Sequence, residues 1–325
     1  MAVIDLSKIQ KILVISTTHI GDTVLTTPTI SLLREHFPLS HISVMIGPNV
    51  APLFQGSRMV DEVFAYNKKV SWFKRLKFVL ELKKRKFDLV VDLRNTAIPI
   101  FIQPRYRNSL FLDRSSVPMR QKHLNQLRFL FPVDDPGENK FDFFTPEEQT
   151  RALEKLPIAN RSHFMIIAPG AGSDLKRWTI SGFIEVTNYF LEKGMTIVLI
   201  GWERETELGL ELVRKASKPI VNLIGDLTLR ESAGLISRAS LVIANDSAVM
   251  HLAHELDRPT VSIFGPTDEK KYGQEGTNRQ TVRLNLDCTP CEVAQCRLER
   301  RICLDDLPAT SVIQACETLL NHATH

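Results

Sequence analysis

The sequence predicts an α/β protein made of two doubly wound domains, each with a parallel sheet. Short apolar, β-branched runs alternate with longer segments of helical periodicity, and this alternation breaks once and then restarts. Strands that alternate with helices form parallel sheets joined by right-handed crossovers. A length of 325 residues also suits two domains that each bury a core.

In the first half, five short runs are expected to be strands because they are rich in Val, Ile and Leu. They are Lys11–Thr17, His41–Gly47, Val60–Ala65, Phe87–Asn95 and Ser109–Asp113. Helical spacing of apolar residues predicts helices over Thr23–Phe37, Lys68–Lys86 and Lys122–Phe131. An acidic stretch rich in Pro and Gly follows, which places the domain boundary near Pro146–Pro157.

The second half repeats the alternation. The expected strands are His163–Gly170, Met195–Gly201, Val221–Gly225, Leu241–Asp246 and Thr260–Pro266. The expected helices are Ile180–Lys193, Arg204–Ser217, Leu227–Ala239 and Ser247–Asp257. Gly194 follows the first of these helices at the position that favours a left-handed cap. Ligands of doubly wound sheets bind at the carboxyl ends of the strands, which here are expected to face an interdomain cleft.

Composition and charge limit the protein class. With 43% hydrophobic and 24% charged residues, the chain is neither disordered nor fibrous. No apolar run reaches the ~18–20 residues of a membrane span, and the N-terminus lacks the pattern of a secretion signal. We therefore expect a cytoplasmic protein.

Positive charge gathers in the first half, where residues 1–150 contain 21 Lys and Arg against 15 Asp and Glu. Within Lys68–Lys86 nine residues are basic and only Glu81 is acidic. The apolar residues of this segment recur at near-helical spacing, which predicts an amphipathic helix with a cationic face. This helix is either a solvated surface element or a contact with an anionic surface, such as the inner face of the cytoplasmic membrane.

The loop after the first strand, Ser16–Thr23, contains Gly21 alone where a dinucleotide fingerprint needs three glycines. An NAD site is therefore excluded at this position. The loop also holds Asp22 near the start of the next helix. Its carboxylate either caps that helix or takes part in chemistry.

Two loops of the second half have the composition of anion sites. The first combines two glycines, a hydroxyl and two cations: Gly170, Gly172, Ser173, Lys176 and Arg177. Backbone amides and cations of this kind bind a diphosphate without a metal, although a solvated basic loop has the same composition. The second loop places Asp246, Ser247 and Ala248 at a helix start, with His251 on the helix. Its alternatives are a capping residue and a buried histidine.

Four of the five cysteines are close together, at Cys288, Cys291, Cys296 and Cys303. Four thiols with one C-x2-C spacing suit a structural metal site, yet the later spacings are not those of a zinc ribbon. A structural metal, disulfides and a reduced loop all remain open. An odd number of cysteines in a chain of this size argues against a secreted disulfide scaffold.

Together, the segments IGDTVLTTP, APGAGSDLKRW and NDSAVMHLAHELDRPTVSIFGPTD resemble glycosyltransferase family 9, the ADP-heptose:lipopolysaccharide heptosyltransferases. The resemblance covers roughly Lys11 to Leu320. It implies a GT-B architecture with an acceptor-binding domain at 1–155 and a nucleotide-sugar domain at 156–305. Residues 306–325 are then a final helix that returns toward the first domain.

The resemblance also implies inverting transfer of heptose from ADP-heptose to a lipid A-linked core sugar by a monomer that needs no cofactor and binds no nucleic acid. It makes Asp22 the base and Lys176 the lysine of the phosphate loop. It implies donor contacts by Gly170, Gly172, Ser173, Arg177, Asp246, Ser247, Ala248, His251 and either Glu205 or Glu207. Acceptor contacts are expected from Thr17, Thr18 and Gly21. Rival classes are another GT-B nucleotide-sugar enzyme, including an epimerase, and a non-catalytic binder of anionic glycolipid.

Overall fold

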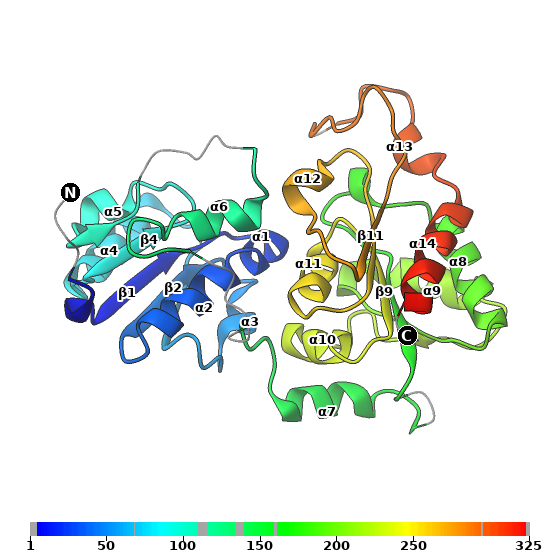
Figure 1. Ribbon diagram of the computed structural model, residues 1–325, viewed down its shortest axis with the longest axis horizontal. Helices are drawn as coiled ribbons and strands as arrows, with labels where there is room; N and C mark the ends of the chain where they lie inside the picture. Colours follow the sequence, from blue (N-terminus) through cyan, green and yellow to red (C-terminus); the bar gives the residue numbers. More distant parts are fainter. Residues whose placement is uncertain are drawn as a thin grey trace. The chain divides into compact units, whose positions relative to one another are not determined.

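The computed structural model describes residues 5–67, 69–109, 116–133, 140–158, 161–293 and 295–322. The chain divides into two compact units, Met1–Phe143 and Phe144–His325. Each unit contains one sheet whose paired strands all run parallel (Figure 1). The predicted α/β class is therefore confirmed.

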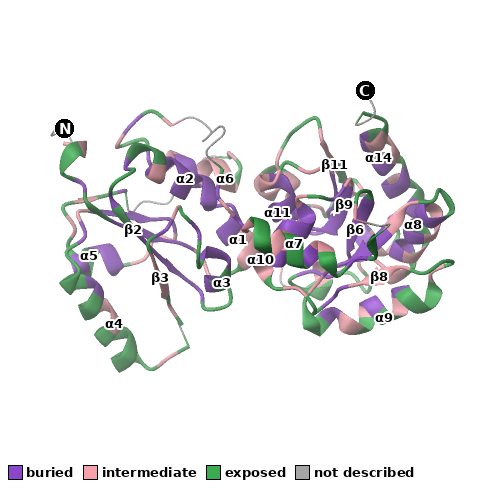
Figure 2. Ribbon diagram, turned by 90° about the horizontal axis from the view of Figure 1, so that it is seen from below, coloured by how far each residue is buried: buried purple, intermediate pink, exposed green. Residues whose placement is uncertain are grey.

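The sheet of the first unit has the order β3-β2-β1-β4-β5. Its strands are β1 (Lys11–Ile15), β2 (His41–Ile46), β3 (Glu62–Ala65), β4 (Leu89–Asp92) and β5 (Tyr106–Arg107). Its helices are η1 (Leu6–Lys8), α1 (Ile20–Val24), α2 (Thr27–His36), α3 (Ala51–Phe54), α4 (Trp72–Lys84), α5 (Ile98–Ile102) and α6 (Met119–Asn125). The central strands are buried because their residues are apolar on both faces (Figure 2).

Two predicted helices of this unit differ from those in the structure. The single helix predicted over Thr23–Phe37 is wrong, because the chain forms α1 and then α2. Pro28 lies in the first turn of α2, where its missing amide costs nothing, so a new helix begins there. The helix predicted over Lys122–Phe131 is α6 in the structure, which begins earlier, at Met119, and ends earlier, at Asn125. The strand expected over Ser109–Asp113 lies outside the described residues after Ser109.

The sheet of the second unit has the order β11-β10-β9-β6-β7-β8. Its strands are β6 (Phe164–Ala168), β7 (Thr196–Leu199), β8 (Val221–Asn222), β9 (Leu241–Asn245), β10 (Thr260–Ile263) and β11 (Arg279–Val282). Its helices are α7 (Pro146–Glu154), η3 (Asp174–Lys176), α8 (Ile180–Glu192), η4 (Glu203–Glu205), α9 (Thr206–Lys215), α10 (Leu229–Ile236), α11 (Ala248–Glu255), α12 (Glu269–Tyr272), α13 (Ile302–Asp305) and α14 (Ala309–His322). The sequence reasoning missed β11, whose polar residues lack the apolar run of the other strands.

One core cluster of this unit joins the sheet to α8, α9 and α14 through Phe183, Leu212 and Val312. Helix α14 contacts α8 and strands β9, β10 and β11, so it belongs to the core of the second unit. Its expected return toward the first unit stays a prediction. Gly194 has a φ of 82° after α8, as the predicted left-handed cap requires.

The division of the chain falls before α7, whereas the sequence reasoning placed it after residue 155. The reason is that α7 packs against α10 of the second unit. A side chain at Gly234 of α10 would lie 2.8 Å from the Cα atom of Gln149 of α7, so the two helices meet at close range. Glu148 of α7 also accepts a hydrogen bond from Arg230 of α10 at 2.8 Å.

No helix among the described residues is long and apolar enough to span a membrane.

Candidate active site residues in the two units

The carboxyl ends of β6 and β9 lie side by side, because Ala168 pairs with Ala244 in the sheet. Asn245, at the end of β9, is fully buried and fixes the loop that follows β6. Its amide nitrogen donates to the carbonyl oxygens of Pro169 and Gly170, at 2.9 and 3.1 Å. Its amide oxygen accepts from the backbone nitrogen of Trp178 at 2.9 Å. Asn245 thus holds both ends of the predicted phosphate loop on the sheet edge.

The next residue, Asp246, has a side chain only 4% exposed and a cation beside it. Lys176 Nζ lies 2.6 Å from Asp246 Oδ2, and the Thr267 hydroxyl donates to the same oxygen at 2.8 Å. His251 Nε2 lies 3.9 Å from Asp246 Oδ1. The structure therefore brings together Lys176, Asp246 and His251 from segments far apart in the sequence. A buried carboxylate needs such compensation for its charge.

Lys176 also borders a polar pocket of about 300 Å³, which we call the Lys176 pocket. The pocket is lined by Ser173, Leu175, Lys176, Pro266, Thr267, Lys271, Tyr272, Glu292 and Val293. Lys176 Nζ and Lys271 Nζ lie 5.6 and 5.0 Å from the centre of the Tyr272 ring. The Lys176 side chain is 31% exposed, so its ammonium group is open to a ligand while paired with Asp246. Two cations and an aromatic face suit an anionic, partly apolar ligand.

The loop around Gly170 also encloses a buried acid, Glu205, which is 4% exposed. A Cβ atom at Gly170 would lie about 2 Å from the Glu205 carboxyl group, and one at Gly201 would lie 2.5 Å from its Oε2 atom. Glu205 Oε2 accepts from the backbone nitrogen of Trp202 at 2.9 Å. Burial raises the pKa of Glu205, against that hydrogen bond and the nearby arginines. Glu207, in contrast, is exposed on the first turn of α9.

Of the remaining predicted residues of this loop, two are exposed and Arg177 is partly buried. Gly172 and Ser173 are exposed, and a Cβ atom at Gly172 would meet no atom of the described residues within 4 Å. Close packing against the protein therefore explains Gly170 but not Gly172. Arg177 donates to Asp174 Oδ1 at 2.6 Å. Arg301 donates to the carbonyl oxygens of both Asp174 and Arg177, which ties α13 to this loop.

Ser247 and Ala248 lie at the start of α11. Ser247 is the N-cap residue by backbone position, yet its hydroxyl makes no cap hydrogen bond. Its oxygen is buried and has no partner among the described residues. The simple capping explanation for Ser247 is therefore wrong. Farther along the helix, burial lowers the pKa of His254 well below its ordinary value, helped by Arg279 and His251.

In the first unit, Asp22 lies in the first turn of α1 and is partly exposed. The N-cap residue of α1 is His19, so the capping explanation for Asp22 is wrong as well. Within the described residues, no hydrogen bond or ion pair engages the Asp22 carboxylate. Gly21 precedes it in the same turn.

The two threonines of this loop differ in what they contact. The Thr17 hydroxyl shares a hydrogen bond with the Thr23 hydroxyl at 2.8 Å, which braces the turn that leads to Asp22. The backbone of Thr18 lies against Gly47, where a Cβ atom would come within 2.9 Å of it. Asp92, at the end of β4, is a buried acid that the sequence reasoning did not select. It accepts from the backbone and side chain of Thr96 and thus orders the turn after β4.

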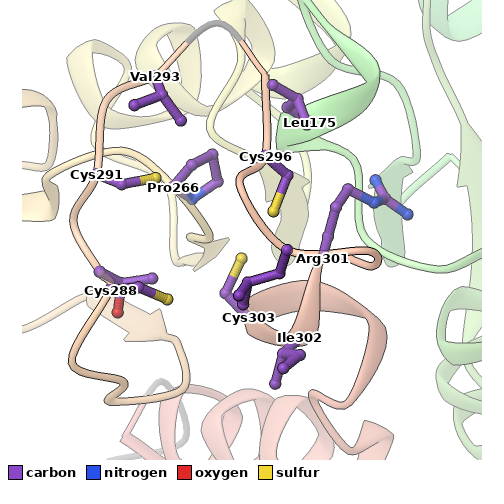
Figure 3. A pocket seen from close by; sticks show the side chains of 11 residues that line it. Leu175, Pro266, Cys288, Cys291, Val293, Cys296, Arg301, Ile302 and Cys303 are labelled. Atoms are coloured by element: carbon purple, nitrogen blue, oxygen red, sulfur yellow. The ribbon is translucent and has the colours of Figure 1, made fainter.

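The four clustered cysteines line a second cavity, which we call the cysteine cavity, shown in Figure 3. All five cysteines of the chain are free thiols. Burial raises the pKa of Cys303, and the thiols of Cys291, Cys296 and Cys288 raise it further.

Sequence reasoning did not select Asn245, Thr267, Lys271 or Tyr272 as site residues. Asn245 is the last residue of β9, and the other three lie in the segment after β10, at the edge of a parallel sheet where ligands bind. This position in the sheet was the signal by which the sequence could have identified them as site residues. Their role here depends on hydrogen bonds and ring contacts between segments, which spacing along the chain does not show.

Comparison with known proteins identifies the family of this chain. Residues 105–302 match the model of glycosyltransferase family 9 (heptosyltransferase). Lipooligosaccharide heptosyltransferase 2 of Campylobacter jejuni is 26% identical over 97% of this chain and 99% of its own length. The solved structure of E. coli ADP-heptose lps heptosyltransferase II covers 97% of this chain and 100% of its own, with 21% identity and a TM-score of 0.78.

A second solved structure, E. coli heptosyltransferase WaaC with ADP-2-deoxy-2-fluoro heptose, covers 95% of this chain and 99% of its own, with 17% identity and a TM-score of 0.69. At these identities the solved structures support the fold alone, which is the expected GT-B fold of two Rossmann-like domains. The family match spans more than half of the chain. The chain therefore belongs to glycosyltransferase family 9, the heptosyltransferase family, and is a glycosyltransferase.

Proposed function

We propose that this enzyme transfers a heptose from ADP-heptose to a lipid A-linked sugar of the lipopolysaccharide core, with inversion at the anomeric carbon. The observation that carries the donor side is the Lys176 ammonium group, which faces a 300 Å³ pocket while paired with the buried Asp246. The names of the relatives support the sugar and the nucleotide, because they are heptosyltransferases and one was solved with an ADP-heptose analogue.

On the donor side, the second unit supplies charge and backbone amides for the diphosphate. Lys176 offsets the negative charge that grows on the departing ADP, and Arg177 adds to this field. The Ser247 hydroxyl and the amides at the start of α11 provide further donors without a metal ion. Asn245 and Thr267 act as positioning residues, because they hold the loop and Asp246 in place. Of the two glutamates, Glu205 lies against Gly170 of the phosphate loop, and it is the one that we propose for the contact with the ribose of the nucleotide.

On the acceptor side, Asp22 removes the proton from the attacking hydroxyl group. An inverting transfer needs such a base, because the oxygen that attacks the anomeric carbon must lose its proton as the bond forms. The Asp22 carboxylate suits this task since no hydrogen bond or ion pair within the described residues competes for it. Thr17 braces the turn, and Thr18 and Gly21 border it for the acceptor.

The direct test is turnover of ADP-heptose on lipid A precursors that carry successive core sugars. The proposal requires a new glycosidic bond whose anomeric configuration is opposite to that of the donor, as read by NMR. No turnover on any of these acceptors, together with turnover of a different nucleotide sugar, would replace heptose as the donor sugar. Interconversion of two nucleotide sugars without transfer would favour the epimerase alternative.

A thermal-shift measurement tests the nucleotide separately. We expect ADP to raise the Tm of the enzyme by several degrees, because a ligand at 100 times its Kd adds about 2.7 kcal/mol of stability. UDP at the same concentration should raise Tm much less. An equal shift with both nucleotides would mean that the second unit recognises the diphosphate but not the base.

Helix α4 also suits a contact with the membrane surface. The sequence suggested its cations as the reason, and its exposed apolar side chains are a second one. Four of its apolar side chains, Trp72, Phe73, Leu76 and Leu80, are 48–66% exposed. Only Leu82 is fully buried, with Phe78 and Val79 packed partly against the core. Most of α4 is exposed (Figure 2). The apolar stripe of α4 therefore faces outward rather than into the protein.

Cations flank this outward stripe, because Lys77, Lys83 and Lys84 are exposed on the same helix. The rings of Trp72 and Phe73 stack at 3.7 Å, and α5, which packs on α4, exposes Ile100 and Phe101. An exposed aromatic stripe with basic neighbours is typical of a helix that lies in the headgroup region of an anionic membrane. We propose that α4 brings the enzyme to the surface where its lipid-linked acceptor resides.

Two variants test this contact with anionic phospholipid vesicles. Changing Lys83, Lys84 and Lys86 to Glu should weaken binding about 100-fold or more at low salt, at ~1 kcal/mol for each basic residue. Changing Trp72 and Phe73 to Ser should weaken binding at both low and high salt, whereas Leu39→Ser, at a fully exposed leucine outside α4, should not. All variants should retain turnover on a deacylated, soluble acceptor. Vesicle binding equal to wild type in both variants would make α4 an ordinary solvated helix.

A further inference from the structure

The cysteine cavity brings together four thiols, three from the segment between β11 and α13 and one, Cys303, from α13. Figure 3 shows the sulfur atoms of Cys288, Cys291, Cys296 and Cys303 turned toward the middle of the cavity. Its volume is about 30 Å³, which is the space of one small ion or water. No thiol of the chain is paired in a disulfide.

The surroundings of the thiols are mostly apolar. Besides the cysteines, the cavity is lined by Leu175, Pro266, Thr289, Val293, Leu298, Arg301 and Ile302. Aliphatic side chains would fill such a space better than four thiols, so packing alone does not explain the cluster. Sulfur ligands in an apolar shell are instead typical of structural metal sites.

The charge of the segment fits the same conclusion. A divalent cation held by four thiolates has a net charge of about −2, which needs compensation in an apolar setting. Arg297, Arg300 and Arg301 lie between the last two cysteines, and Arg301 itself lines the cavity. Glu299 is the only acid between these cysteines, while Asp306 and Asp305, which follow Cys303, pair with Arg300 and Arg301.

We propose that Cys288, Cys291, Cys296 and Cys303 bind one thiophilic metal ion, zinc or iron, as a structural site. On binding, each thiol releases its proton to water as its sulfur bonds the ion, with no change of oxidation state. Among the described residues, no three side chains lie close enough together to hold a metal ion as they stand. The site therefore requires the thiols to move inward on the ion.

The backbone of this segment permits that movement. Between β11 and α13 the described residues contain neither a helix nor a strand. Near the first two cysteines the chain is tied to Pro266, whose carbonyl oxygen accepts from the backbone nitrogens of Cys291 and Glu292 at 2.9 Å. The segment can thus contract around an ion without breaking the sheet.

The site would also stabilise the wall of the Lys176 pocket, an effect that rests on the proposed function. Leu175, Pro266 and Val293 line both cavities. Arg301, two residues before Cys303, donates to the carbonyl oxygens of Asp174 and Arg177 in the loop that carries Lys176. Loss of the ion is therefore expected to loosen this loop and to weaken the binding of ADP.

The test begins with wild-type protein purified under reducing conditions. Metal analysis should find about one equivalent of zinc or iron per chain, and the two are told apart by the element and by the visible absorption of iron–thiolate bonds. After removal with a mercurial and a chelator, Co²⁺ should restore about one equivalent with the sulfur-to-cobalt charge-transfer bands of tetrahedral thiolate coordination. This readout requires no catalytic activity.

Single Cys→Ser variants at the four positions should each lose most of the bound metal and lower Tm, while Cys316→Ala serves as the control. Cys316 is buried in the core near α8 and is not part of the cavity. Two disulfides found by mass spectrometry in freshly purified protein would overturn the proposal. So would free thiols at all four positions of the cluster in folded wild type that bind neither Zn²⁺ nor Co²⁺. Metal binding with unchanged ADP affinity after its removal would refute only the coupling to the Lys176 pocket.

Discussion

Asp22→Asn is expected to abolish transfer while leaving ADP affinity nearly unchanged. The amide has the shape of the carboxylate but accepts no proton, so the attacking hydroxyl group has no base. General bases contribute about 10²- to 10⁴-fold to rate, and kcat should fall by at least the lower of these factors. ADP affinity should persist because every residue proposed to contact the nucleotide belongs to the second unit. Single-turnover kinetics and calorimetry with ADP measure the two quantities.

A matched control is Glu35→Gln in α2, which removes an exposed carboxylate from the same unit. It should retain full turnover and full ADP affinity. If Asp22 acted only by its favourable interaction with the dipole of α1, its loss would lower the free energy of unfolding by about 0.3–1 kcal/mol, and turnover would be preserved. A variant with more than about a tenth of wild-type turnover, a deficit under ~1.4 kcal/mol, would give Asp22 that structural role.

The strands and crossovers could be predicted from sequence because a buried parallel sheet needs continuous apolar runs, and both halves contain them. The break between α1 and α2 shows where periodicity is insufficient. Thr23–Phe37 has helical spacing throughout, yet Pro28 allows a second start within it. In α4 the spacing of Trp72, Phe73, Leu76 and Leu80 was visible, but spacing does not tell which side of a helix meets the core. That depends on Phe78 and Leu82, which contact the sheet cluster instead.

The candidate site divides in the same way. Small residues, cations and an acid at strand ends pointed to Lys176 and Asp246, because such ends meet at one edge of the sheet. Spacing did not separate Glu205 from Glu207, since only the folded loop shows Glu205 enclosed by Gly170 and Gly201. Likewise, the sequence gives no reason to distinguish Gly170 from Gly172. In the described structure a side chain at Gly170 would collide with Glu205, whereas one at Gly172 would not meet a neighbour.

Lys176→Ala is expected to weaken ADP binding by about 10- to 100-fold and to slow transfer as well. Removing one charge-assisted contact costs roughly 1.5–3 kcal/mol, and the same ammonium group is proposed to offset charge on the leaving diphosphate. The matched control is Lys270→Ala, an exposed lysine of α12 that does not line the Lys176 pocket. It should leave both quantities at wild-type values. Unchanged affinity and turnover in Lys176→Ala would leave this loop as a solvated surface.

Because Lys176 also forms an ion pair with Asp246, its removal can lower ADP affinity in two ways. A double-mutant cycle separates the lost contact with the diphosphate from the lost ion pair. Lys176→Ala alone leaves a carboxylate that is 4% exposed, with Thr267 and His251 beside it but without its lysine, so part of the loss will come from a buried charge that has lost its counter-ion. Asp246→Asn removes that charge. If Lys176 serves only to neutralise Asp246, the double variant should recover ADP affinity. If Lys176 contacts the diphosphate, as we propose, the double variant should stay at least about tenfold weaker than Asp246→Asn alone, and its transfer should remain slow even when ADP-heptose is saturating.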